Sequence, residues 1–213
     1  MYHKMKLIFA SIVFIVVSNL SYAATDTTAT RILNDLQKKF SAAKGIQAAF
    51  TLNQKDKNGK TTGIQKGNVA IKGNKYYVRA GSYEVFCNGT KVYHFDGGPE
   101  VLSNKITDAI EEPFSPKNII SGQFLKDFSG AVTSNTATQY ILQLTPNDKR
   151  KSIKFATITI DKKKNIISKA VLTDKAGNAT EVIISGVNTN VEIADSVFEF
   201  DLKKHPGVRE VLQ

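Results

Sequence analysis

Few side chains in this sequence could do chemistry, and the most suggestive pair is His94 and Asp96. They lie two residues apart in the run VYHFD, so on a strand they share a face and the aspartate could orient the histidine. Nucleophilic catalysis also needs a nucleophile beside such a base. The sequence contains no G-x-S-x-G, H-E-x-x-H or G-x-G-x-x-G motif. An extracytoplasmic hydrolase built on His94 is the minor interpretation, and we expect no enzyme activity.

The residues that bind metals or form disulfides are also sparse. Cys87 is the only cysteine, so no disulfide can form within the chain. We expect it to be a small apolar residue of a sheet. His94 and His205 are far apart in sequence, and the pair Glu111 and Glu112 is typical of a polar loop. These residues do not show the spacing that metal ligands have in a sequence. We therefore expect neither a metal nor a cofactor.

The chain is strongly basic, with a formal net charge of +10. Its lysines lie in predicted turns, such as residues 55–60 and 162–164, and they are not interleaved with aromatic residues. A surface that stacks on bases needs such interleaving, so we expect no nucleic-acid partner. The charge favours solubility, or attraction to an anionic surface or an acidic partner.

The first residues carry the marks of an export signal. Lys4 and Lys6 precede a short apolar run, residues 7–17, and small residues follow at Ser21 and Ala23. This pattern is typical of a secretory signal peptide over residues 1–23, and the apolar run is short for a membrane span. We expect cleavage near Ala23 and a single soluble domain over residues 24–213.

The stretch from Ile46 to Phe95 predicts consecutive antiparallel strands. Ile46, Ala48, Phe50 and Leu52 alternate with polar neighbours, which is typical of a strand with one buried face. The pair Asn88-Gly89 predicts a type I′ hairpin turn with positive φ at both residues. The strands expected over the whole chain are 46–53, 61–72, 75–80, 83–87, 90–95, a short run near 101–102, 139–145, 153–160, 166–173 and 179–187. Phe198 and Phe200 also alternate near the end.

Two segments predict helices. Residues 28–43 place Ile32, Leu33, Leu36 and Phe40 on one stripe. Residues 106–128 form one or two short apolar helices with proline breakers. About ten strands with two helical segments favour an antiparallel sheet that is closed or half-closed on itself, with helices against one face. The apolar face of this sheet has two interpretations, an ordinary core or a cavity for an apolar ligand.

The order of the segments resembles the periplasmic outer-membrane lipoprotein carrier family. The chain contains, in this order, the runs KKFSAAKGIQAAFTL, GNVAIKGNKYYV and NGTKVYHFD. The family's lid helix is similar to the central run SPKNIISGQFL, and its tail is similar to SVFEFDLKKHPGVREV. This resemblance implies an incomplete antiparallel β-barrel, or half-barrel, covered by a helical lid. It also implies a periplasmic carrier that shields the acyl chains of lipoproteins. In that family an inner-membrane ABC exporter releases the lipoproteins, and an acceptor protein or the outer membrane itself receives them.

The same resemblance implies which side chains line the acyl-chain cavity, and it implies a monomer without catalytic residues. The lining residues are Leu36, Phe40, Phe50, Leu52, Val69, Ile71, Tyr77, Val85, Val92, Ile119, Ile120 and Phe124. The alternative is a related binding domain that senses lipids or lipoproteins of the cell envelope without transporting them.

One departure from the family's pattern concerns the latch of the lid. Many members carry an arginine just after the position of Lys72, and this chain has Gly73 there. Arg79 shares a face with Tyr77 by parity, so we expect Arg79 to replace the latch or to contact the head group of the lipoprotein. The alternative is that Tyr76 and Val78 face inward while Arg79 is solvated.

Overall fold

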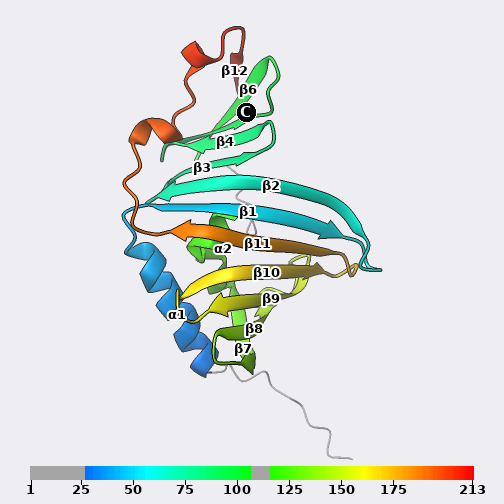
Figure 1. The fold of residues 1–213 in the computed structure, drawn as a ribbon. Helices are drawn as coiled ribbons and strands as arrows, with labels where there is room; N and C mark the ends of the chain where they lie inside the picture. The colour runs from blue at the N-terminus through cyan, green and yellow to red at the C-terminus, as the bar shows by residue number, and fades with distance from the viewer. Residues whose placement is uncertain (1–26, 107–115) are drawn as a thin grey trace, which may run out of the picture.

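The fold is one open sheet of twelve strands with helices against it (Figure 1). The computed structural model describes residues 27–106 and 116–213. The predicted signal peptide, its cleavage near Ala23 and the pair Glu111 and Glu112 lie outside these ranges. The strands run β1 Ile46–Lys55, β2 Thr61–Lys72, β3 Lys75–Ala80, β4 Tyr83–Cys87, β5 Lys91–Phe95, β6 Glu100–Lys105, β7 Phe128–Asn135, β8 Gln139–Pro146, β9 Ile153–Asp161, β10 Ile166–Asp174, β11 Ala179–Asn188 and β12 Arg209–Leu212.

The strand order explains why the sheet does not close. It is β12-β6-β5-β4-β3-β2-β1-β11-β10-β9-β8-β7, so hairpins build each half and the pairing of β1 with β11 joins the halves. Every pair is antiparallel except β12 with β6, and β12 and β7 stay as the two edges. The predicted fold class, an incomplete antiparallel barrel with few helices, is confirmed as this open sheet.

Two helical segments cover the sheet. Helix α1, Thr27–Ser41, buries Ala29, Ile32, Leu33, Leu36 and Phe40, the stripe that its sequence predicts. Helix α2, Pro116–Ser121, is followed by the 3-10 turn η1, Gln123–Asp127. Both helices contribute to one large apolar cluster with both halves of the sheet. We call the sheet face that carries this cluster the inner face.

The sequence did not predict two of the strands, and the alternation of Phe198 and Phe200 does not correspond to a strand. Strand β7 follows η1 directly, and β12 pairs with β6 from the far end of the chain. Phe198 and Phe200 belong to no strand, because Phe198 ends the 3-10 turn η2, Asp195–Phe198, and Phe200 follows it. A second short turn, η3, spans Leu202–Lys204.

The hairpin at Asn88-Gly89 forms, but its turn type differs from the prediction. Asn88 is not among the described residues with positive φ, whereas Gly89 has φ 94°. The Asn88 N–H donates to the Lys91 carbonyl, and its side-chain Oδ1 accepts from the N–H groups of Thr90 and Lys91. Gly89 and Thr90 are therefore the central residues, and the asparagine acts as a turn-capping side chain.

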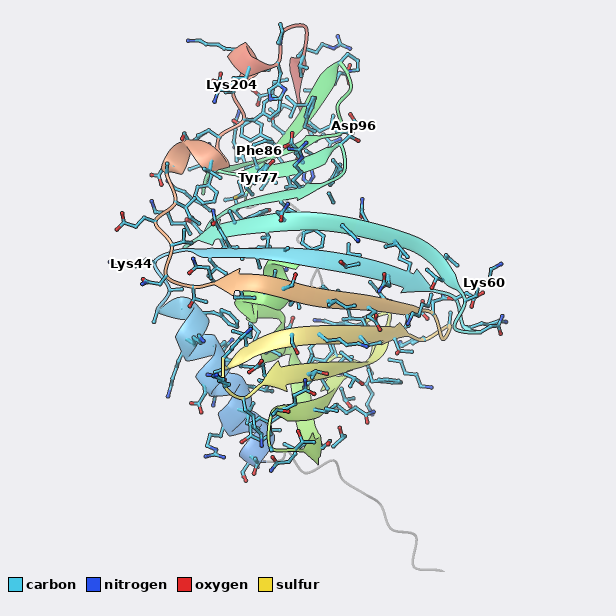
Figure 2. All side chains as sticks on the ribbon, in the orientation of Figure 1. Lys44, Lys60, Tyr77, Phe86, Asp96 and Lys204 are labelled. Atoms are coloured by element: carbon cyan, nitrogen blue, oxygen red, sulfur yellow. The ribbon has the colours of Figure 1, made fainter. Side chains whose placement is uncertain are left out.

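The C-terminal segment, residues 191–213, covers the outer face of the sheet over β2–β6. Ile193 and Phe198 form an apolar cluster with Ala70 and Tyr77. Phe200 forms another with Phe95 and Val101, against Phe86 and Tyr93. Tyr77 and Phe86 point toward this segment (Figure 2). Each face of the sheet is thus covered by a different part of the chain: the helices cover the inner face, and the C-terminal segment covers the outer face over β2–β6.

The start of this segment is held by one acidic side chain between two lysines. Asp195 accepts from Lys72 Nζ at 2.8 Å and from Lys75 Nζ at 2.9 Å. These two bonds, Lys72 first, lower the pKa of Asp195 from 3.8 to about 2. The ionised carboxylate is thus favoured in the folded state. Its stabilising contribution is complete above pH 3.8 and is lost as the pH falls towards 2.

We therefore expect Asp195→Asn to be less resistant to urea than the wild type at about pH 6, with the two converging as the pH approaches about 2. Urea unfolding midpoints measured across this range test the expectation. A double variant, Lys72→Gln with Lys75→Gln, retains Asp195 and should show the same flattened pH dependence as Asp195→Asn. A gap between wild type and Asp195→Asn that stays constant down to the lowest pH would contradict the assignment.

Candidate functional site

The inner face of β1–β5 is a grid of apolar side chains set by strand register. One row runs from Ile46 to Ile71 and Tyr76, which pair across β1, β2 and β3, and it continues to Cys87 and Val92. Residues directly opposite each other in neighbouring strands point to the same side of the sheet. The row is almost fully buried, with Val92 only 1% exposed.

The helices close this face from the inside. Leu36 and Phe40 of α1 and Ile119 and Ile120 of α2 all belong to the inner cluster. Helix α2 packs against β2, β3 and β10, and so bridges both halves of the sheet. Gly122 ends it with φ 68°, a conformation that favours glycine.

Most of the residues predicted to line the cavity do meet on this surface. Ten lie in the inner cluster or pack against it: Leu36, Phe40, Phe50, Leu52, Val69, Ile71, Val85, Val92, Ile119 and Ile120. The side chain of Phe124 lies outside the described part of the structure. Whether this surface holds an acyl chain stays a prediction.

Tyr77 and Arg79 do not belong to the inner face, which corrects two predictions. Tyr77 packs in the outer cluster, and its hydroxyl donates to Glu84. Burial first and this hydrogen bond second raise the pKa of Tyr77 to about 12. Arg79 is 61% exposed, with its Nε 3.9 Å from Glu84 Oε1. The alternative prediction is confirmed, because Tyr76 lies in the inner cluster, Val78 packs against it and Arg79 is solvated.

The pair that suggested hydrolysis is separated. His94 Nδ1 lies 2.8 Å from the Tyr83 hydroxyl, and burial lowers the pKa of His94. Asp96 instead accepts from the backbone N–H of Gly98 at 2.9 Å. Cys87 is buried in strand β4, as predicted. Asp96 therefore does not orient His94, and the hydrolase interpretation loses its central contact.

Lys117 is a buried charged residue of the inner face that sequence reasoning missed. It lies in α2, is only 6% exposed and places Nζ 4.8 Å from the centre of the Tyr76 ring. A lysine beside Pro116 in SPKNII would normally be assigned to the solvent side of a short helix. Its spacing of three from Ile120 is the one signal in the sequence that places it toward the buried side.

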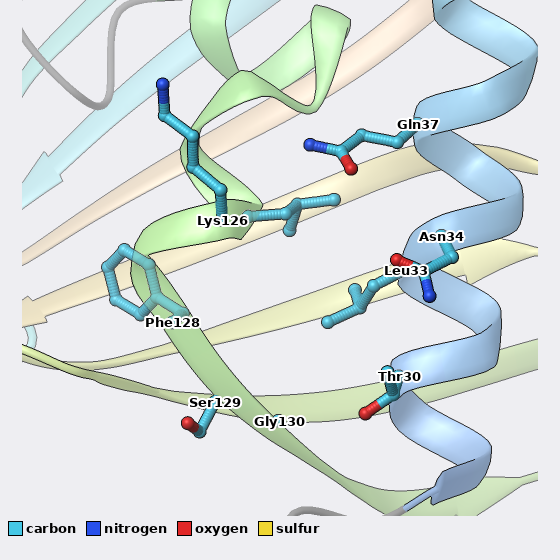
Figure 3. Close-up of a pocket in the computed structure, with 9 residues that line it drawn as sticks. Thr30, Leu33, Asn34, Gln37, Lys126, Phe128, Ser129 and Gly130 are labelled. Carbon is cyan, nitrogen blue, oxygen red and sulfur yellow. The ribbon is translucent and has the colours of Figure 1, made fainter.

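The inner face is filled by side chains in this state. A cavity of about 210 Å³ lies between α1 and the η1–β7 segment, where Leu33 and Gln37 face Lys126 and Phe128 (Figure 3). Ligand pockets usually measure about 300–1,000 Å³, so the cavity is small for a lipid. A groove of about 440 Å³ lies on the outer face between β1–β2 and Val197. We call the arrangement with α2 packed on the inner face the closed state.

Within residues 27–106 and 116–213, no group of three or more histidine, cysteine or carboxylate side chains is placed to hold a metal ion. No helix in the same residues is long and apolar enough to cross a membrane.

An open half-barrel whose apolar inner face is closed by two helices defines a class of binding domains. The chain belongs to one family of that class, because the model of the family described as outer membrane lipoprotein carrier protein LolA matches residues 41–201. The members of this family are carrier or binding proteins, and this chain is a LolA-like binding domain.

Individual proteins are similar to this chain at low identity. An outer-membrane lipoprotein carrier protein of Pseudomonas entomophila (strain L48) is 25% identical over 193 residues, or 89% of this chain and 91% of that protein. A conserved protein from Thermus thermophilus has a TM-score of 0.59 at 10% identity over 87% of this chain and 99% of that one. A LolA superfamily protein from Nitrosomonas europaea has a TM-score of 0.46 at 13% identity, over 82% and 98%.

Proposed function

We propose that this protein is a periplasmic carrier that binds the acyl chains of lipoproteins between the inner face of the sheet and helices α1 and α2. In this proposal it receives lipoproteins from an inner-membrane ABC exporter and delivers them to an outer-membrane acceptor. The observation that carries the proposal is the position of α2. A helix of six residues with Ile119 and Ile120 fully buried bridges both halves of an unclosed sheet.

The energetics explain why such a protein is needed. Each buried methylene group contributes about 0.8 kcal/mol, so exposing two or three long acyl chains to water costs on the order of tens of kcal/mol. A carrier offsets this cost with apolar surface of its own. In the closed state that surface is covered by α1 and α2, which keeps the empty protein soluble, and ligand binding requires α2 to move away from the sheet.

A short helix is suited to this movement. Six residues are too few to form a stable helix in isolation, so α2 depends on its contacts with the sheet and with α1. Segments held by a few side-chain contacts open at a lower free energy than the whole domain. Strands β1 and β11, in contrast, are joined along most of their length and provide the rigid wall.

We expect the protein purified from its own periplasm to carry a bound acylated polypeptide, detectable by native mass spectrometry. The control is residues 24–213 produced in a cytoplasm, where no exported lipoprotein reaches the protein and only the unbound mass is expected. If the periplasmic protein is also found only unbound, the carrier proposal fails. Incubation of the complex with outer-membrane vesicles then distinguishes transport from sensing. A carrier releases the lipoprotein to the vesicles, and a sensor retains it.

A further inference from the structure

The apolar inner face carries polar side chains where it reaches β5 and β6. One row of inward-facing residues crosses β1–β6 in register, and its members are Ala48, Val69, Val78, Val85, His94 and Leu102. Ala48 and Val69 are buried, whereas the side chains from β3 to β6 are half-buried. Helix α2 packs mainly against β2, β3 and β10, so the row emerges from beneath this helix toward β6. His94 is the polar member of the row.

One nitrogen of the His94 ring is free to bind a ligand. Nδ1 lies 2.8 Å from the Tyr83 hydroxyl, and within residues 27–106 and 116–213 Nε2 has no hydrogen-bond partner. Burial lowers the pKa of His94, so the ring is neutral at pH 7. When the tyrosine hydroxyl donates to Nδ1, the ring proton sits on Nε2. The ring then offers one N–H donor on the inner face.

Asn104 on β6 supplies a hydrogen-bond acceptor beside this donor. It lies opposite Val92, a member of the inner cluster, and diagonal to His94, a relation that separates two side chains by about 7–8 Å. Its Oδ1 is buried and accepts no hydrogen bond in the described part of the chain. Nearly all buried polar groups in folded proteins are hydrogen-bonded, and leaving one unpaired costs free energy. The amide oxygen of Asn104 therefore calls for a donor that the folded chain does not supply.

A neutral donor next to a neutral acceptor is complementary to an amide. A secondary amide carries one carbonyl acceptor and one N–H donor, whereas an ester carries acceptors only. The residues that flank His94 in the row are Val85 and Leu102, so the two polar groups are set in an apolar surface. A hydrogen bond is stronger in such surroundings than in water, and an unpaired polar group there is more costly. The pair therefore distinguishes an amide from a linkage without an N–H.

We propose that His94 and Asn104 bind an amide linkage at the head of an acyl chain, with the amide carbonyl accepting from His94 Nε2 and the amide N–H donating to Asn104 Oδ1. This inference rests on the acyl-chain binding proposed above and adds the polar group that the same surface takes. The chain lies over Val85, Val78 and Val69, and it enters the space beneath α2 when that helix moves outward. Because both polar residues belong to strands, they fix the head of the ligand on the sheet and not on the moving helix.

The test compares compounds of equal chain length that differ only in the linkage to a terminal methyl group. N-methylpalmitamide, methyl palmitate and hexadecyl methyl ether are titrated against the protein to displace the neutral dye N-phenyl-1-naphthylamine. Asn104→Leu should weaken binding of the amide about tenfold and leave the other two within about twofold, because the amide alone carries an N–H. His94→Phe should weaken binding of the amide and the ester about tenfold each and leave the ether within about twofold, because the ether has no carbonyl.

The matched control is Gln143→Leu, which replaces an exposed polar residue of β8 between the inward-facing Leu142 and Leu144. It should change none of the affinities by more than about twofold. If Asn104→Leu and His94→Phe weaken all three compounds equally, or weaken none of them, the two residues do not recognise the linkage and the inference is overturned. If none of the compounds displaces the dye from the wild type, the proposed acyl-chain binding itself fails, which is a different result.

A measurement on the wild type alone decides the question if a variant does not fold. The carbonyl stretch of isotope-labelled N-methylpalmitamide is recorded by infrared spectroscopy in the complex and in hexadecane. We expect a lower frequency in the complex, because the carbonyl accepts a hydrogen bond from His94. A bound carbonyl that absorbs as it does in hexadecane accepts no hydrogen bond, and this result would overturn the inference.

Discussion

Replacing Ile120 with alanine is expected to tighten acyl-chain binding by about tenfold or more, although it removes apolar surface. Ile120 is 1% exposed and joins α2 to the inner cluster. Truncating a buried isoleucine to alanine costs about 2–5 kcal/mol. Because α2 is short, we expect this loss to fall mainly on the closed state. A ligand that binds only the open state gains in apparent affinity as that state becomes more populated.

The measurement is the displacement of the neutral dye N-phenyl-1-naphthylamine by palmitate, combined with thermal unfolding. Ile158→Ala is the matched control, because Ile158 on β9 is also fully buried in the inner cluster but belongs to the sheet. It should lower the melting temperature without any gain in affinity. If Ile120→Ala also lowers the melting temperature and the affinity does not rise, α2 is a permanent part of the core and not a lid.

Replacing Phe200 with alanine is expected to lower the free energy of unfolding by about 3–5 kcal/mol. This is a large share of the roughly 5–15 kcal/mol that stabilises a typical domain. Phe200 lies at the centre of a ring cluster on the outer face, with centroid distances of 5.5 Å to Phe86, 5.2 Å to Phe95 and 4.5 Å to His205. Loss of this ring removes the main attachment of the C-terminal segment to the sheet.

Urea unfolding measures the change, and hydrogen exchange locates it. The backbone amides of β12 should lose protection in Phe200→Ala, because β12 depends on the segment that Phe200 holds in place. Leu202→Ala is the control: Leu202 lies two residues away and is 42% exposed, so its truncation should change stability by no more than about 0.5 kcal/mol. Equal stability of the two variants would show that the ring cluster does not anchor the segment.

The elements that the sequence predicted well are those with a strong local pattern. The bounds of β2, β3 and β4 agree with the prediction, since each strand is flanked by turn residues such as Gly73 and Gly81. Helix α1 follows from its apolar stripe. Strand β7 was missed because FSGAVTSN has weak strand propensity. It forms because its backbone pairs with β8, and Gly130 leaves room for the side chain of its partner Leu144, since a Cβ atom at position 130 would lie 2.9 Å from a Leu144 methyl group.

The sequence predicted that the candidate site is lined by apolar side chains, but it did not identify all of the residues that line it. Alternation shows that one face of a strand is buried and not which face, and in KYYVRA both Tyr76 and Tyr77 are candidates for the inside. Only the pairing of Tyr76 with Ile71 and Cys87 decides between them. Lys117 was missed for a similar reason, since a lysine is assigned to solvent unless a contact shows otherwise.

The separation of His94 from Asp96 is likewise a property of the tertiary structure. By itself the sequence determined that this is a mainly β protein with an apolar strand face, two helical segments and no catalytic motif, because these properties follow from residue types and local periodicity. The tertiary structure alone decided that His94 pairs with Tyr83, that Lys117 faces the inner surface and that the C-terminal segment covers the outer one. Each of these depends on contacts between strands or segments whose register no local pattern specifies.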